Sequence, residues 1–110
     1  MAERLVDVWV NCPDRVTAER IADACVTARL AACANIFAPI FSIYRWKGAI
    51  ERAEEVPLVL KTRAELFEAL SARVKALHPY EVPSIVATEL PLVEKDYADW
   101  LAAETQETTT

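Results

Sequence analysis

The sequence predicts an α+β fold, a ferredoxin-like βαββαβ sandwich with a long hairpin between its second and third strands and an extra C-terminal helix. Three observations predict it. Apolar residues alternate in two short segments, they recur at helical spacing in two others, and the only glycine divides a long stretch rich in Ile, Phe and Tyr. The resulting order is that of a split βαβ unit, an antiparallel sheet with helices packed on one face.

The first strand and the first helix are expected near the N-terminus. From Leu5 to Val10 the side chains alternate between two faces, with the three valines on one face, which is typical of a strand. Pro13 then interrupts the pattern. From Arg15 to Leu30 apolar residues recur every three or four positions, so this segment is predicted to be helical with Asp14 as its N-cap.

A long hairpin is expected in the middle of the chain. Its first arm runs from Cys33 to Trp46 and contains Pro39, whose missing N–H predicts a bulge or an edge position. Its second arm runs from Ala49 to Lys61. Lys47-Gly48 lies between the arms, and glycine supplies the positive φ that a tight turn needs.

The length of this hairpin predicts self-association. Each arm would extend about 40 Å at the rise of a β-strand, which is more than the two short strands beside it can cover. An uncovered strand edge that carries apolar side chains is a site for pairing with another chain. We therefore expect the hairpin to pair with another copy of the protein.

The second helix and the fourth strand follow. Thr62 and Glu65 have the spacing of a capping box, which predicts a helix start at Thr62. Apolar residues at helical spacing continue to Leu77, and Pro79 disfavours the helical conformation of His78, so the helix is expected to end at about His78. Alternation from Ser84 to Leu90 predicts the fourth strand.

The remaining chain is predicted to form a short third helix and a tail. Tyr97, Trp100 and Leu101 have helical spacing, whereas residues 104–110 are polar and offer little to bury. We expect a single domain over residues 1–103, with the tail outside it. No internal repeat or linker divides the chain.

Composition excludes several classes of function. A net charge of −5 and a pI near 4.9 disfavour nucleic acid, because binding to phosphates depends on Lys and Arg. No apolar run is long enough to span a membrane and no leader pattern is present, so we expect a cytoplasmic protein. One glycine is too few for a Walker loop or a G-x-G-x-x-G turn. Three cysteines, an odd number without metal-site spacing, are expected to be reduced thiols.

Four motifs give a family resemblance. In order and spacing they resemble the CutA divalent-cation tolerance proteins, and the resemblance extends from about Leu5 to Leu101. The motifs are Leu30–Ile36, Ser42–Gly48, Leu60–Arg63 and Leu77–Pro83. The resemblance implies a cytoplasmic homotrimer similar in architecture to PII signalling proteins, a link to tolerance of copper and other divalent metals, and no catalysed reaction.

The resemblance also implies metal ligands, but the sequence departs from the family pattern. Metal-binding members carry a cysteine late in the first strand and paired histidines near the end of the second helix, positions that Val10 and Leu77 occupy here. His78, Cys12 and Glu81 remain as candidate ligands. Because one imidazole holds a divalent ion only weakly, we expect weak binding of Cu²⁺ or a similar cation. The alternative is that His78 only ends the helix, with its ring facing the last carbonyls.

A second set of residues is implied to line a cleft between subunits, where PII-like relatives bind small molecules. It comprises Tyr44, Trp46, Glu55, Lys61 and Tyr80. The alternative function is therefore a PII-like signalling or scaffold protein that binds a small anionic ligand. Interface packing explains Tyr44 and Trp46 equally well. Lys61 needs an acidic partner or an anion if it lies in an interface.

The cysteines leave one further alternative. Cys25 and Cys33 are predicted to pack in the core, whereas Cys12, at a strand end, is expected to be the most accessible thiol. A thiol-dependent enzyme would use Cys12 with His78 as its base, which requires a lowered thiol pKa and direct hydrogen bonding.

Overall fold

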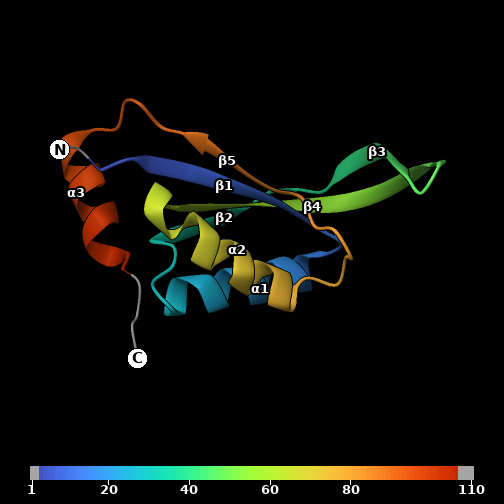
Figure 1. The fold of residues 1–110 in the computed structure, drawn as a ribbon, viewed down its shortest axis with the longest axis horizontal. Helices are drawn as coiled ribbons and strands as arrows, with labels where there is room; N and C mark the ends of the chain where they lie inside the picture. Colours follow the sequence, from blue (N-terminus) through green and yellow to red (C-terminus); the bar gives the residue numbers. More distant parts are fainter. Residues whose placement is uncertain (1–2, 107–110) are drawn as a thin grey trace.

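The computed structural model describes residues 3–106, which form a five-stranded antiparallel sheet and three α-helices (Figure 1). The strands are β1 (Leu5–Cys12), β2 (Cys33–Ile36), β3 (Ile40–Trp46), β4 (Ala49–Arg63) and β5 (Ile85–Glu89). The helices are α1 (Arg15–Thr27), α2 (Phe67–Leu77) and α3 (Lys95–Glu104), with a short 3₁₀ helix, η1 (Ala64–Leu66), before α2. The predicted α+β class is confirmed.

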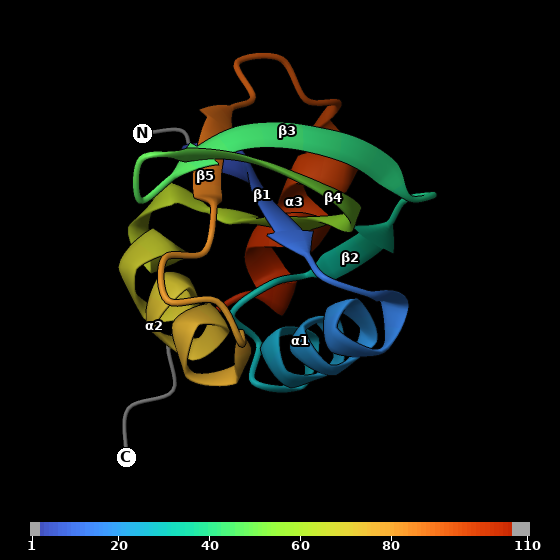
Figure 2. The same ribbon diagram turned by 90° about the vertical axis from the view of Figure 1, so that its right-hand side faces the viewer.

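The sheet has the order β2-β4-β1-β5, and all neighbouring strands are antiparallel. The alternation predicted for the first strand is confirmed, because Val6, Val8 and Val10 are buried whereas Trp9 is exposed. Helices α1 and α2 lie together against one face of the sheet (Figures 1 and 2). α3 lies at the end of the sheet opposite to β3 (Figure 1).

The long hairpin is present, with its turn at Lys47-Gly48, where both residues have positive φ. β3 and the part of β4 paired with it project beyond the helices and form what we call the arm (Figure 1). The expected single strand from Cys33 to Trp46 is divided into β2 and β3. Three residues separate Ile36 from Ile40, but only two separate their partners on β4, so one extra residue bulges near Pro39. The predicted bulge is thus confirmed, and β2 is also an edge strand.

The first helix begins as predicted but ends earlier. The Asp14 carboxylate accepts a hydrogen bond from a backbone N–H of the first turn, 2.8 Å away. The helix ends at Thr27 instead of Leu30, because Arg29 adopts a left-handed conformation (φ 64°) and the Leu30 N–H donates to the Cys25 carbonyl. These bonds form a Schellman motif, which an arginine closes here instead of the usual glycine.

The capping box predicted at Thr62 is wrong. Thr62 lies within β4 opposite Val6, and its buried hydroxyl has no hydrogen-bond partner among residues 3–106. The Glu65 carboxylate instead accepts from Arg63, and the α-helix proper begins only after η1. Sheet pairing therefore overrides the local helix signal. The predicted end of the helix at His78 is confirmed, since this residue is the C-cap of α2.

The C-terminal helix is confirmed, but the prediction places the start of the polar tail too early in the chain. Glu104 still belongs to α3, and Thr105 is fully buried, with its hydroxyl donating to the Leu101 carbonyl. Arg63 donates to both the hydroxyl and the carbonyl oxygen of Thr105. The rest of the expected tail, residues 107–110, lies outside the described residues. No helix in the described part of the chain is both long and apolar enough to cross a membrane.

Candidate functional site

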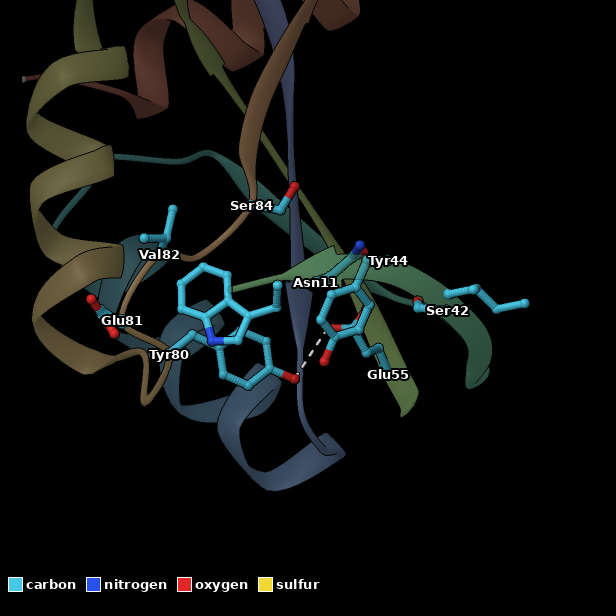
Figure 3. A pocket seen from close by; sticks show the side chains of 10 residues that line it. Asn11, Ser42, Tyr44, Glu55, Tyr80, Glu81, Val82 and Ser84 are labelled. Carbon is cyan, nitrogen blue, oxygen red and sulfur yellow. Dashed lines mark hydrogen bonds between the residues drawn. The ribbon is translucent and has the colours of Figure 1, made fainter. Parts of the chain in front are cut away.

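A cavity of about 600 Å³ lies where the arm meets the segment between α2 and β5 (Figure 3). β1 and the two strands of the arm form one side of it, and the segment after α2 forms the other. The lining residues are Asn11, Ser42, Ile43, Tyr44, Trp46, Glu55, Tyr80, Glu81, Val82 and Ser84. Four of the five predicted cleft residues therefore come together in this pocket within one chain.

The buried charge of the pocket is Glu55. Its side chain is on β4, and the residue is only 6% exposed. The Tyr80 hydroxyl donates a hydrogen bond of 3.1 Å to one carboxylate oxygen of Glu55 (Figure 3). Burial, and then the negative charge of Glu55, raise the pKa of Tyr80 to about 12, so this hydroxyl remains protonated and able to donate at neutral pH. Among residues 3–106, no Lys, Arg or His side chain forms an ion pair with Glu55.

The mouth of the pocket carries a second carboxylate, which has a partner. Lys47 Nζ lies 3.4 Å from a Glu81 oxygen and 5.5 Å from the centroid of the Trp46 ring. Both side chains of this ion pair are mostly exposed, so the pair adds little to stability. It does show that the rim accommodates an ammonium group between an aromatic ring and a carboxylate.

Lys61 lies away from this pocket. It faces Asp7 across the β1–β4 pair, and its Nζ is 3.0 Å from an Asp7 oxygen in a partly buried ion pair. The acidic partner that Lys61 was expected to need is therefore Asp7, on the neighbouring strand. None of the lining residues in the described part of the chain is basic.

His78 is buried directly behind the pocket. Its Nε2 lies 2.8 Å from the Asn11 carbonyl oxygen, and the Tyr80 N–H donates to its Nδ1 at 3.2 Å. Since Nδ1 accepts a hydrogen bond, Nε2 carries the hydrogen and donates it, which leaves no free lone pair in the ring plane. The expectation that the ring faces the last carbonyls of α2 is wrong, because it faces β1. The ring instead packs on the Tyr80 ring, with their centroids 4.7 Å apart, and helps to fix Tyr80 in the pocket wall.

The expectation that Cys12 is the most accessible thiol is also wrong. Cys12 is fully buried, and burial, followed by the charges of Asp14 and Glu55, raises its pKa to about 11. The prediction that Cys33 packs in the core is wrong, because Cys33 is only partly buried, the least buried of the three cysteines, with its sulfur 3.8 Å from the Tyr97 hydroxyl. Cys25 is buried as predicted. A protonated, buried Cys12 lacks the lowered pKa that a thiol nucleophile needs.

The three candidate metal ligands do not form a metal centre within one chain. The Cys12 thiol is protonated, both nitrogens of His78 are hydrogen-bonded, and Glu81 is paired with Lys47 at the pocket mouth. Within residues 3–106, no group of three or more His, Cys, Asp or Glu side chains has the arrangement of a metal site. These residues therefore do not fit a resident metal ion in the single chain.

Several pocket residues could not be identified from the sequence. Asn11 and Ser42 reach the pocket only because β1 and β3 both lie beside β4, a pairing that no local pattern specifies. Val82 and Ser84 had one signal, since Pro79 and Pro83 restrict the backbone of the segment after α2. That segment bends at residues 80–82 and forms one wall of the pocket.

The fold and the site define a small α+β protein with a projecting arm and an aromatic, acidic pocket at its base. The model of the family described as CutA1 divalent ion tolerance protein matches residues 6–104. The chain belongs to the CutA divalent-cation tolerance family. It is 45% identical to the divalent-cation tolerance protein CutA of Thermus thermophilus over 89% of this chain and 95% of that one. Identity with the protein of the same name from Pyrococcus horikoshii is 40%, over 93% and 99% of the two chains.

Solved structures agree with this assignment. The divalent cation tolerance protein from Thermus thermophilus superposes with a TM-score of 0.90 at 43% identity, covering 93% of this chain and 99% of that one. CutA1 from Oryza sativa superposes with a TM-score of 0.92 at 34% identity, covering 97% and 98%. The projecting arm and the short C-terminal helix thus belong to a fold that CutA proteins share.

Proposed function

We propose that the protein acts in divalent-cation tolerance as a cytoplasmic homotrimer that catalyses no reaction. Its subunits would be ferredoxin-like and arranged as in PII signalling proteins. Family membership supports the link to metal tolerance, because the relatives are named for it. The observation that carries self-association is the apolar surface of the arm.

The arm exposes several large apolar side chains. The large apolar side chains exposed on it are Ile40, Phe41, Ile43, Tyr44 and Ile50. Within residues 3–106, β3 pairs only with β4, so its other edge offers free backbone N–H and C=O groups. A second copy would bury the exposed side chains that do not line the pocket, such as Phe41, and pair with this edge, which is why the arm favours assembly.

The open face of the sheet supports the same proposal. Trp9 and Val86 are exposed on neighbouring strands β1 and β5, opposite each other in the register. The Trp9 ring also contacts the half-exposed Phe37, with ring centroids 5.5 Å apart. An aromatic cluster on a face that α1 and α2 leave uncovered has the composition of an interface core.

Direct binding of Cu²⁺ or a related cation is the less supported part of the proposal. For His78 to ligate a metal, its ring must give up a hydrogen bond to Asn11 or Tyr80. We therefore propose that any binding through His78, with Glu81 and Cys12 as further ligands, is weak in the folded chain.

The test is calorimetric titration of Cu²⁺ and, separately, Zn²⁺ into the reduced protein and its His78→Ala variant, with the mass measured by light scattering. We expect a trimeric mass and weak binding that differs little between the two proteins. Tight, stoichiometric binding that disappears in the variant would contradict our interpretation of the His78 hydrogen bonds. A monomeric mass for the unmodified protein would refute the assembly.

The second candidate is a PII-like signalling or scaffold protein that responds to a small molecule. The pocket favours it, because its volume lies within the range of small-molecule sites and it combines apolar walls with a few polar groups. A ligand that prefers the native assembly raises its thermal midpoint. Comparing this midpoint with divalent metals and with small molecules therefore separates the two candidates.

A further inference from the structure

We infer that the pocket binds a small organic cation through a protonated primary amine, with Glu55 as the counter-charge. This inference rests on the second candidate function, in which the pocket binds a small molecule. It changes the class of ligand from the expected anion to a cation, and the reason lies in the charges that the structure places around the pocket.

Glu55 is a buried carboxylate without a cation. Its one hydrogen bond comes from the neutral Tyr80 hydroxyl, and its other oxygen has no hydrogen-bond donor among residues 3–106. Two lysines that the sequence or the pocket mouth offers as partners are paired elsewhere, Lys61 with Asp7 and Lys47 with Glu81. This second oxygen is not among the fully buried atoms that lack a partner, so it faces the cavity, where a cation would compensate the largely buried charge. An ammonium ligand would supply that cation, whereas an anion would be repelled by both carboxylates.

The aromatic side chains favour the same ligand. Tyr44, Trp46 and Tyr80 all line the cavity, and Figure 3 shows the labelled Tyr44 and Tyr80 side chains near Glu55. A cation over an aromatic face gains about 0.5–1 kcal/mol when exposed and about 2 when desolvated. A pocket in which rings surround a carboxylate therefore binds an organic cation better than a neutral molecule of the same shape.

The chain itself already contains an example of this recognition. The Lys47 ammonium lies at the pocket mouth, between the Trp46 ring and the Glu81 carboxylate. A primary amine deeper in the cavity would meet the same combination of groups at Glu55. A primary amine suits this position better than a quaternary one, because its N–H groups can donate to the unused oxygen of Glu55.

Three probes of similar shape and different charge test the inference: benzylammonium, benzyl alcohol and benzoate. Each is titrated into the assembled protein and followed by NMR shifts of the indole N–H groups. The variants are Glu55→Gln, which removes the charge but keeps an acceptor for Tyr80, and Glu19→Gln, an exposed site on α1 that removes the same charge elsewhere. A Trp46→Leu variant gives a second test if Glu55→Gln does not fold.

We expect benzylammonium to bind the unmodified protein at least ten times more tightly than the other two probes. Glu55→Gln should lower the affinity for benzylammonium at least tenfold and leave the affinity for benzyl alcohol unchanged, whereas Glu19→Gln should change neither affinity. Trp46→Leu should lower the affinity for benzylammonium more than the affinity for benzyl alcohol. Binding of benzoate or benzyl alcohol as tight as that of benzylammonium would overturn the inference but retain the pocket as a ligand site. Binding of none of them to a folded, assembled protein would overturn both.

Discussion

Replacing Phe41 by alanine provides a quantitative test of the assembly. This side chain lies on the arm and is 67% exposed in the single chain. A phenylalanine offers about 150–250 Å² of surface, so roughly 130 Å² would be removed from water if a partner covered it. At about 25 cal/mol per Å², this burial contributes about 3 kcal/mol for each copy. Phe41→Ala should therefore weaken each contact between copies by about two orders of magnitude.

Sedimentation velocity over a dilution series measures this effect. The variant should dissociate at protein concentrations at which the unmodified protein remains assembled. Val16→Ala is the matched control, because Val16 is about equally exposed but lies on α1, outside the arm. Since Phe41 is exposed in the single chain, circular dichroism of both variants should remain that of the folded protein. If Phe41→Ala assembles as tightly as the control, the arm is not the site of association.

Three further predictions concern stability and thiol chemistry. Arg63→Ala should lower the free energy of unfolding, measured in urea titrations, by about 2–4 kcal/mol. The reason is that the hydroxyl and carbonyl oxygens of the buried Thr105, at the end of α3, lose the donor that Arg63 provides. A loss below about 0.5 kcal/mol would contradict this role. At pH 7.5 a thiol reagent should label Cys33 first, because burial raises the pKa of both Cys12 and Cys25 to about 11. Fast labelling of Cys12 or Cys25 in the folded protein would contradict this order. Both pKa values are raised from 9.0 in the folded chain, so above pH 9 the thiols of the unfolded chain ionise first. The free energy of unfolding should therefore be unaffected by these thiols below pH 9 and should fall as the pH rises toward 11.

Local patterns were sufficient to predict most of the elements. The alternation of β1, the N-cap at Asp14, the turn at Gly48 and the end of α2 near His78 each depend on residues close together in the sequence. Even the bulge near Pro39 followed from the chemistry of one residue. In these places the tertiary structure agrees with the local preference of the chain.

Three of the incorrect predictions share a physical cause, which is contact between segments distant in sequence. Thr62 has the spacing of a helix cap, but pairing with β1 holds it in β4. Thr105 is polar, yet Arg63 satisfies its hydroxyl and allows it to be buried. His78 ends α2 as expected, but its ring bonds to Asn11 on β1. No local pattern contains these partners, so the sequence alone could not reveal them.

The membership of the candidate site was predictable in part, whereas its charge was not. The resemblance to the family identified Tyr44, Trp46, Glu55 and Tyr80 as neighbours, and the structure brings them together. The resemblance also suggested Lys61, but this residue lies outside the pocket and pairs with Asp7. Without Lys61, the charged lining residues that the structure describes are acidic. A single ion pair across β1 and β4 thus changes the class of ligand that the pocket favours.

The arm links the two proposals through β3. Ser42, Ile43, Tyr44 and Trp46 of β3 line the pocket, whereas Phe41 does not. A partner that covers Phe41 would hold the strand that supplies these pocket residues, through a side chain that is not itself part of the pocket. Assembly should then strengthen binding of an organic cation, and by reciprocity the cation should strengthen assembly by the same factor. Benzylammonium affinity in Phe41→Ala, whose pocket residues are unchanged, measures this coupling, and equal affinity in the dissociated and assembled protein would show that none exists.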